Sequence, residues 1–400
     1  MANVSSSNGL EKRPKLRFPG FDEPYRTTPL GEIASLVNRT DPKSNAPIMM
    51  LSAGNGFIMQ SEKYSRDNAG QSLKKYILLK QGELAYNHGA SKAKQFGCCY
   101  ELTEPEARIP YVYHCFKIND HEYTPFIAMA LNNAKMDNQL KRLVSSSVRM
   151  DGLLNISFED YMSVTLHLPS STEQKHIADF LKKIDERIAA QEKLLASLKK
   201  YKRGVVKAIL SKRIRFADDR GNYYPEWSEC TLQEVVDFLD GQRKPLESAD
   251  RAKRQGKYPY YGASGIIDYI DDYIFDEPLL LLGEDGANII NRSSPLCFIA
   301  TGKYWVNNHA HVMRPRKGQN IKFICELLES LDYTRYNTGT AQPKLNQEKC
   351  RQIALHLPTY EEQCHIAEFL SLVEQKSIHA QTELDSLLRT KNALMQQLFI

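Results

Sequence analysis

The sequence predicts a mixed α/β protein in which two mixed α/β domains are joined by two long antiparallel helices that form a coiled coil. Three observations predict this fold class with its internal pseudo-twofold duplication. Residues 164–210 recur as residues 353–399. Each copy places an apolar residue every three or four positions, the heptad pattern of a helix that pairs with another helix. The intervening regions alternate short β-rich runs with turn residues. A repeat of this length indicates two copies of one structural unit.

The repeated segment is predicted to be a strand end, a proline that stops the strand, and a long helix. The copies align without a gap at an offset of 189 residues, and about 15 of their 47 positions are identical. Both contain Leu-Pro-x-x-x-Glu-Gln-x-x-Ile-Ala-x-Phe-Leu. The predicted helix-pair seam consists of Ile177, Leu181, Ile184, Ile188, Leu195, Leu198, Val205, Ile366, Leu370, Val373, Leu384, Leu387 and Leu394.

Two readings of these helices differ in what covers the apolar stripe. Each helix could bury its stripe against its own domain, which is the common fate of an amphipathic helix. A helix of about 36 residues is roughly 54 Å long, however, which is more than one small domain covers. Pairing of the two helices is therefore favoured. Lys202 and Lys391 interrupt the stripe at matched positions, as polar residues that fix register do.

Length and composition predict two to three domains and a cytoplasmic protein. The chain has 400 residues, eight scattered cysteines without a Cys-x-x-Cys pair, and a polar start. No apolar run has the length of a membrane span, and unpaired cysteines are typical of a reducing compartment. The expected divisions are 1–163 (first variable domain, with a flexible 1–18), 164–214 (first repeat segment), 215–352 (second variable domain) and 353–400 (second repeat segment).

The entries into the two variable domains also correspond, at an offset of 202 residues. Tyr25 matches Trp227, and Leu30-Gly-Glu-Ile matches Leu232-Gln-Glu-Val. The variable domains are expected to hold short strands, with helices over 124–143 and near 321–330. Strand order does not follow from the pattern.

Positive charge concentrates on the first long helix and its exit. Residues 166–215 contain 13 Lys and Arg against 5 Asp and Glu. Such a run is usually a solvated helix face, but it also suits phosphate groups. Lys199, Lys200, Arg203, Lys212 and Arg213 carry the charge at the end of this helix and are the candidates for contact with phosphate groups.

Motifs for catalysis are absent from the sequence. It lacks a Gly-x-x-x-x-Gly-Lys phosphate loop, a Gly-x-Gly-x-x-Gly fingerprint, His-Glu-x-x-His and any Pro-Pro pair. His309 and His311 would share one side of a strand, but without a third ligand they are better explained as polar or base-contacting side chains than as a metal pair. Glu284 and Asp285 lie between glycines, which favours a tight turn over a nuclease site. No catalytic residue and no metal site are predicted.

The residues that carry these patterns resemble the specificity (S) subunit of type I restriction–modification systems. The resemblance rests on the duplicated Leu-Pro-x-x-x-Glu-Gln-x-x-Ile-Ala-x-Phe-Leu segment and on the Trp227-x-x-x-x-Leu-x-Glu-Val entry. Tyr258-Pro-Tyr-Tyr-Gly-Ala-Ser-Gly-Ile-Ile and Leu282-Gly-Glu-Asp-Gly add to it in the second domain. The first domain matches more loosely, and its entry has Tyr25 in place of tryptophan.

The resemblance implies a non-catalytic DNA-recognition subunit with two target-recognition domains. Each domain would read one half of a bipartite double-stranded DNA target, and the helices would set the distance between the halves. Two methyltransferase (M) subunits would dock on the helical region, and restriction–motor (R) subunits would complete the complex. S-adenosylmethionine, ATP and Mg would belong to those partners, so that this chain holds no cofactor. The alternatives are a specificity-like scaffold that does not read DNA, and a stand-alone DNA methyltransferase or nuclease with an unrecognised site.

Base reading requires hydrogen-bonding side chains on loops, such as Asn or Gln to adenine and Arg to guanine. In the first domain, the candidate DNA-binding residues are Asn87, His88, Ser91, Lys92, Lys94 and Gln95. In the second, they are Tyr261, Ser264, Asn288, Arg292, Asn307, Asn308 and His309. The alternative is that these are turn formers and solvated polar residues.

Overall fold

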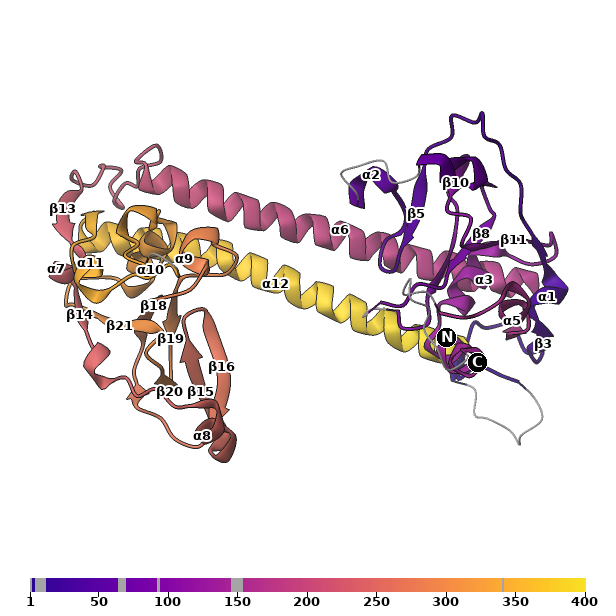
Figure 1. Ribbon diagram of the computed structural model, residues 1–400. Helices are drawn as coiled ribbons and strands as arrows, with labels where there is room; N and C mark the ends of the chain where they lie inside the picture. Colours follow the sequence, from indigo (N-terminus) through magenta and orange to yellow (C-terminus); the bar gives the residue numbers. More distant parts are fainter. Residues whose placement is uncertain (1, 4–11, 64–69, 92–93, 145–153, 340–341) are drawn as a thin grey trace. The chain divides into compact units, whose positions relative to one another are not determined.

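The computed structural model describes residues 2–3, 12–63, 70–91, 94–144, 154–339 and 342–400. They form two compact units: unit 1 is Met1–Glu192 with Glu383–Ile400, and unit 2 is Lys193–Thr382. Each unit therefore contains one variable domain and a part of both long helices (Figure 1). The mixed α/β class is confirmed. Within the described ranges, no helix has both the length and the hydropathy of a membrane span.

Unit 1 consists of short strands with few helices. Its strands are β1 (Ala2–Asn3), β2 (Leu16–Arg17), β3 (Arg26–Pro29), β4 (Ala34–Leu36), β5 (Met49–Ser52), β6 (Gly56–Met59), β7 (Ile77–Lys80), β8 (Leu84–Asn87), β9 (Cys98–Glu101), β10 (Glu106–Ile109), β11 (His114–Ile118) and β12 (Thr165–Leu168). Its helices are α1 (Leu30–Ile33), α2 (Gln60–Lys63), η1 (Gly70–Lys75), α3 (Thr124–Leu131), α4 (Ala134–Leu143) and α5 (Phe158–Met162), with η a 3₁₀ helix.

Unit 2 repeats this arrangement with different strand lengths. Its strands are β13 (Ser228–Thr231), β14 (Val236–Phe238), β15 (Gln255–Gly262), β16 (Gly265–Ile270), β17 (Phe275–Asp276), β18 (Leu279–Gly283), β19 (Cys297–Ala300), β20 (Lys303–Val306), β21 (Ala310–Pro315) and β22 (Ala354–Leu357). Its helices are α7 (Leu232–Val235), η2 (Asp240–Gln242), α8 (Ser248–Lys253), α9 (Asn288–Asn291), α10 (Ile321–Ser330), η3 (Thr334–Tyr336) and α11 (Gln347–Arg351).

The duplication extends to strand order. The central sheet of unit 1 has the order β4-β11-β8-β9, and that of unit 2 has the order β14-β21-β18-β19. The entry strand pairs with the strand before each long helix, as β3 with β12 and β13 with β22. Burial of the central strands on both faces explains their apolar runs, since Leu279 to Leu282 are all fully buried.

The helix expected over 124–143 is two helices, so that prediction was wrong in its continuity. The chain breaks at Asn132 and Asn133. Asn133 caps α4 by accepting from the Lys135 N–H at 3.0 Å. The Asn132 side chain accepts from the backbone N–H of Cys99 at 3.1 Å and donates to its carbonyl. Two asparagines thus end one helix, start the next and tie the break to β9.

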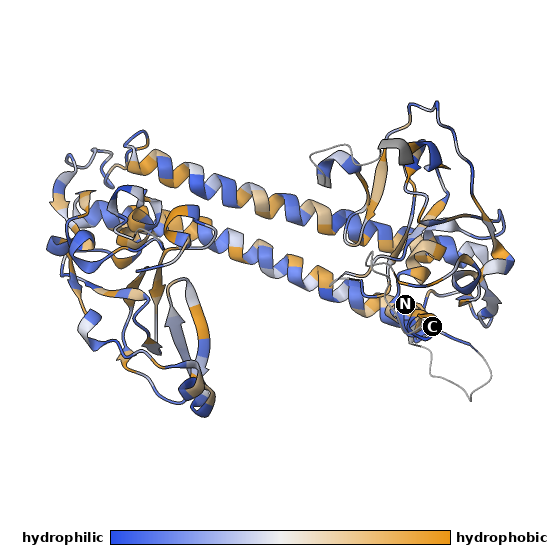
Figure 2. Ribbon diagram, in the orientation of Figure 1, coloured by the Kyte–Doolittle hydropathy of each residue, from blue (hydrophilic) through white to orange (hydrophobic). Residues whose placement is uncertain are grey.

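The long helices are α6 (Ser171–Leu210, 40 residues) and α12 (Tyr360–Leu398, 39 residues). Hydrophobic positions recur along both of them between hydrophilic ones (Figure 2). Every predicted seam residue is buried or half-buried. Ion pairs within each unit show that the helices run antiparallel: Lys391 to Asp185 at 2.5 Å in unit 1, and Lys202 to Glu374 at 3.5 Å in unit 2. These are the same pair in the two copies of the repeat, because both partners are related by the offset of 189.

The repeated Glu-Gln explains how each long helix begins. Gln174 donates to the Pro169 carbonyl at 3.0 Å and accepts from the Tyr123 N–H at 2.9 Å, just before α3. Gln363 makes the matching bonds, to the Pro358 carbonyl at 3.1 Å and from the Asn320 N–H at 2.9 Å, just before α10. One glutamine therefore joins the start of a long helix to the start of a domain helix in each unit.

Candidate nucleic-acid interface

In unit 1 the candidate residues lie at the end of β8 and in the loop that follows. Asn87 is half-buried, and its side-chain oxygen accepts from the Gly89 N–H at 2.9 Å. Ser91 and Gln95 are exposed, and the Ser91 hydroxyl accepts from the Lys94 N–H at 3.1 Å. The loop returns at Gly97, whose φ of 82° suits glycine and where an added Cβ would lie 2.4 Å from the Asn87 carbonyl oxygen.

Two candidate residues of this loop, His88 and Lys94, make hydrogen bonds that hold the loop in place. His88 is buried, and its two ring nitrogens lie 2.9 Å from the Leu154 carbonyl and 3.0 Å from the Val112 carbonyl. Lys94 donates to the Asn132 carbonyl at 2.7 Å, which ties the loop to the break between α3 and α4. Lys92 lies outside the described residues.

In unit 2 several candidates lie at one connected edge of the domain. The Asn307 N–H donates to the Tyr261 carbonyl at 3.0 Å, and the Asn307 side-chain oxygen accepts from the His309 N–H at 2.8 Å. The imidazole of His309 reaches Asp285 at 2.7 Å. Asn307 itself is buried, whereas His309 is half exposed. The turn between β20 and β21 is thus hydrogen-bonded to the residues that follow β18.

Exposed polar groups at this edge come from two turns. Ser264 is exposed in the two-residue turn between β15 and β16, and Asn308 is exposed between β20 and β21. The first turn closes tightly over β18, because a Cβ at Gly283 would lie 2.7 Å from the Ala263 carbonyl oxygen. Tyr261 is half-buried and packs on Phe298 and Tyr304, so its ring belongs largely to the core.

Asn288 and Arg292 bond within the β18–β19 connection and to α10. Asn288 accepts from the Ser294 N–H at 2.9 Å and donates to the Ser294 carbonyl at 3.0 Å. Arg292, at a φ of 51°, pairs with Glu329 of α10 at 2.8 Å and lies over the Tyr333 ring. Their bonds fix the β18–β19 connection to α10.

The sequence did not predict a charged network around His311, which connects to this edge through Glu284. His311 is 1% exposed, and its ring nitrogens lie 2.7 Å from Asp240 and 2.7 Å from the Leu345 carbonyl. Burial opposes a charge there, but the hydrogen bond with Asp240 raises the pKa of His311 to about 10. Arg243 joins the network by donating to Glu284 at 2.8 Å. The acids at 284 and 285 are therefore structural partners of Arg243 and His309. Among the described residues, no group of three potential ligands could hold a metal ion.

The sequence also did not predict that apolar residues of β16 are exposed next to the Ser264 turn. Ile266, Ile267 and Tyr269 of β16 are about half exposed, at 45%, 54% and 50%. Strand β16 ends its sheet, which has the order β16-β15-β20-β17. The signal was present as Gly265-Ile-Ile, but a run of this kind reads equally well as a buried strand.

The basic residues of α6 differ in environment. Lys199, Lys200 and Arg203 are exposed. Lys202 is only 24% exposed and pairs with Glu326 at 2.7 Å. Beyond the helix, Lys212 lies 3.6 Å from Glu226 and over the Trp227 ring.

The comparisons with known proteins give the family. A family model for the type I restriction modification DNA specificity domain matches residues 72–200 and 224–389, more than half of the chain. The chain belongs to this family. The match covers both units, in agreement with the duplicated sheets.

Relatives of this specificity family share parts of the sequence. A putative type I restriction enzyme specificity subunit from Haemophilus influenzae is 32% identical over 145 residues, which are 36% of this chain and 36% of that protein. The EcoprrI specificity subunit from Escherichia coli is 28% identical over 146 residues, 36% of this chain and 35% of that protein. The matched segments therefore span about a third of the length of these relatives.

Solved structures agree in fold. The S subunit of a type I restriction–modification system from M. genitalium superposes with a TM-score of 0.61 at 16% identity, covering 97% of this chain and 99% of that one. A chain from a study of complex assembly in the type I system gives 0.54 at 15% identity, covering 96% and 98%. Two domains with long packed helices are thus the fold of this specificity family.

Proposed function

We propose that this chain is the non-catalytic subunit that reads the DNA target of a type I restriction–modification enzyme, with one half of a bipartite target read by each unit. The observation that supports it is that the two units share the strand order of their central sheets but differ in the side chains at the ends of those strands. The central sheets have the same strand order, but the ends of β8 and β18 and the turns beside them carry different side chains. Two similar frames with different hydrogen-bonding edges suit two different base sequences.

Exposure and local bonding together divide the candidates into proposed readers and supports, and the half-buried Asn87 is counted as a reader because it ends β8 beside the exposed loop. In unit 1 the proposed readers are Asn87, Ser91 and Gln95. In unit 2 they are Ser264, Asn308 and His309, with the exposed face of β16 available for apolar contact with bases. His88, Lys94, Asn288, Arg292 and Asn307 then act by holding these loops in place, since their polar groups are bonded within the unit.

The partners in this proposal are double-stranded DNA, two M subunits docked on the α6–α12 region, and R subunits. S-adenosylmethionine, ATP and Mg serve the partners, and the complex works in the cytoplasm.

The exposed Lys199, Lys200 and Arg203 face either the DNA backbone or an M subunit. If they face DNA, their replacement by Gln lowers the salt slope of DNA binding by roughly one unit for each phosphate group that is no longer neutralised. An unchanged slope with weaker assembly assigns them to the M subunit.

The test compares one reader from each unit in the complex reconstituted with M subunits. Asn87→Ala should relax base preference in one half of the target, and Asn308→Ala in the other half. The loss for the correct base should be about 1–3 kcal/mol, or roughly 5- to 150-fold in competition binding. The target itself is found by mapping methylated bases in cells that carry the complete system.

Three results would contradict the proposal. Equal loss for all sequences would make the residue a phosphate contact or a structural one. Sequence-independent binding by the complete complex would favour the scaffold alternative. Methylation or cleavage of DNA by this chain alone would favour the enzyme alternative.

A further inference from the structure

The two units differ at a cavity that the repeat places in the same position in each. In unit 1 the cavity is lined by Leu166, His167 and Phe399; in unit 2 it is lined by the matched Leu355, His356 and Leu210. Its volume is about 30 Å³ in unit 1 and about 370 Å³ in unit 2. One unit has therefore filled a space that the other leaves open.

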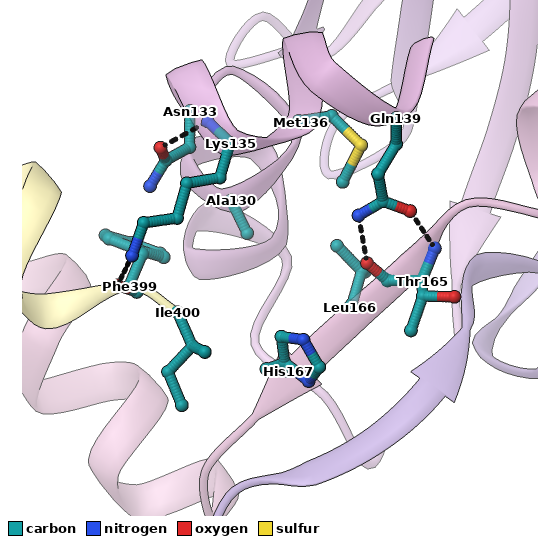
Figure 3. Close-up of a pocket in the computed structure, with 10 residues that line it drawn as sticks. All are labelled: Ala130, Asn133, Lys135, Met136, Gln139, Thr165, Leu166, His167, Phe399 and Ile400. Carbon is teal, nitrogen blue, oxygen red and sulfur yellow. Dashed lines mark hydrogen bonds between the residues drawn. The ribbon is translucent and has the colours of Figure 1, made fainter. Parts of the chain in front are cut away.

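Side chains of helix α4 line the small cavity that remains in unit 1 (Figure 3). The Met136 side chain is buried, and the Lys135 ammonium donates to the Phe399 carbonyl at 2.8 Å. Gln139 donates to the Thr165 carbonyl at 2.8 Å and accepts from the Thr165 N–H at 2.9 Å. The helix thus supplies an apolar side chain and, three residues later, an amide that satisfies both backbone groups on the outer edge of β12.

Among the described residues of unit 2, no helix follows α10 in the way that α4 follows α3. After α10 these residues form only the three-residue turn η3 before α11. The Leu232 N–H donates to the Ile353 carbonyl at 2.9 Å. By the alternation of an antiparallel ladder, the backbone groups of the next residue, Ala354, point away from β13. Ala354 is exposed and lines the cavity, so no side chain of the described residues covers this strand edge as Gln139 does in unit 1.

The walls of the open cavity are apolar, and its rim carries Lys212 and His356, each beside an acid of this chain: Glu226 lies 3.6 Å from Lys212, and Glu229 lies 3.0 Å from His356. Trp227, Leu327 and Leu331 supply the apolar wall. Lys212 and His356 also line it, with side chains that are 37% and 52% exposed. A volume near 370 Å³ lies within the range of pockets that bind ligands. An occupant that suits this chemistry is apolar on one face and carries an amide for the strand edge. It can also place an acid where α4 carries Lys135, because the ion pair of Lys212 with Glu226 is long, at 3.6 Å.

We propose that the unit 2 cavity is a docking site for an amphipathic helix of a protein partner, which takes the place that α4 takes in unit 1. The partner helix presents a large apolar side chain and, three residues later, a glutamine or asparagine to Ala354. An acidic residue next to the apolar one faces Lys212. The site is separate from the proposed DNA-reading turns, so this inference stands or falls independently of base recognition.

The probe is a synthetic peptide of residues 133–144 with Lys135→Glu. It is lactam-bridged on its outer face, because a helix this short is marginal in water. Binding to the full chain is followed by fluorescence anisotropy. Saturable binding with a Kd below about 1 mM is expected, equivalent to about 4 kcal/mol. Peptides with Met136→Asp or Gln139→Ala should bind at least about 10-fold more weakly, since each removes one of the two interactions that hold the helix.

Variants of the chain locate the binding. Ser330→Trp fills the cavity from its exposed rim, and Ser330→Ala is the matched control. Ala354→Pro removes only the outward N–H of an edge strand, where proline is tolerated. Both Ser330→Trp and Ala354→Pro should weaken peptide binding at least about 10-fold, and Ser330→Ala should not. Thermal unfolding confirms that each variant is folded. No saturable binding up to about 1 mM, or unchanged binding to the two folded blocking variants, overturns the proposal.

Discussion

His114 of unit 1 and His311 of unit 2 occupy the same position in the two central sheets but have opposite pKa shifts. Each directs Nε2 to the backbone carbonyl just before the matched helices α5 and α11: His114 to Ile156 at 2.9 Å and His311 to Leu345 at 2.7 Å. Burial lowers the pKa of His114, whose neighbour is His88. The second nitrogen of His311 meets Asp240 instead, and its pKa rises to about 10.

These two histidines show which interactions the duplication preserves. The hydrogen bond from the sheet to the following segment is kept in both units, because it closes the same chain connection. The charge around it is free to change, since one unit places a histidine beside the ring and the other an aspartate. The same holds at the start of the long helices. Glu173 is buried against Arg17, whereas the matched Glu362 is buried against the Trp227 indole at 3.2 Å.

Loss of the Arg17–Glu173 ion pair should destabilise the protein more than loss of the Trp227–Glu362 hydrogen bond. Arg17 and Glu173 form a two-pronged ion pair at 2.7 and 2.8 Å, with side chains 5% and 0% exposed. Arg17→Met leaves the carboxylate buried without its cation, which should destabilise unit 1 by about 3–5 kcal/mol. Trp227→Phe removes one neutral donor and should cost unit 2 about 1–2 kcal/mol.

Hydrogen exchange of peptides from each unit, measured during urea unfolding, separates the two effects. The double variant Arg17→Met with Glu173→Gln is the control, because neutralising the buried carboxylate should recover part of the stability that Arg17→Met alone removes. Equal losses in the two units would show that the ion pair and the indole bond are equivalent.

Replacing His311 or His114 with Gln should have a smaller effect on stability. Asp240 holds His311 in its charged form, so His311→Gln should destabilise unit 2 by about 2 kcal/mol at pH 7. His114→Gln removes a neutral hydrogen bond and should cost unit 1 about 1 kcal/mol. Both tryptophans, Trp227 and Trp305, lie in unit 2, so their fluorescence reports the unfolding of unit 2, and hydrogen exchange of unit 1 peptides measures the loss for His114→Gln. A larger loss for His114→Gln would contradict the assignment of charge.

The same pair predicts different pH limits for the two units. The pKa of His311 is raised, so its contribution is complete below the ordinary value of about 6.5 and is lost as the pH rises towards about 10. The pKa of His114 is lowered, so the unfolded chain binds the proton more readily and stability is lost as the pH falls below about 6.5. Unit 2 should therefore weaken first in alkali through His311, and unit 1 in acid through His114. Replacing either histidine with Gln should flatten the corresponding limb in urea titrations across pH.

Much of the fold was predictable because the repeat carries it. The heptad spacing gave the helix pair, and the Leu-Pro-x-x-x-Glu-Gln pattern gave the start of each long helix. The break of 124–143 at Asn132 was not predictable, since it depends on the bond between that side chain and Cys99 of a distant strand. The buried state of His88 and Asn307 was likewise hidden, because a polar residue after a strand reads the same whether it faces solvent or a backbone carbonyl. The pairing of His311 with Asp240 joins residues 71 positions apart, for which the sequence offers no signal.

Replacing the lysines that interrupt the helix seam should have the smallest effect on stability. Lys202 is 24% exposed and lies between Glu326 and Glu374, but Lys322 pairs with the same two acids. Lys202→Met therefore leaves neither acid alone and should cost about 1 kcal/mol. Lys391 is 33% exposed, and its partner Asp185 is 43% exposed, so water replaces the missing cation. Lys391→Met should thus cost less than about 0.5 kcal/mol, as exposed pairs do.

In both variants methionine keeps the apolar stem against the seam, so only the charge is tested. Urea unfolding at low and at high salt gives the measurement, because screening should reduce the small Lys391 effect further. If Lys391→Met instead costs as much as Lys202→Met at both salt concentrations, the two lysines act on the alignment of the helices rather than through their local charges. A reversed pair, Lys391→Asp with Asp185→Lys, would then restore stability, since the same register would again place opposite charges together.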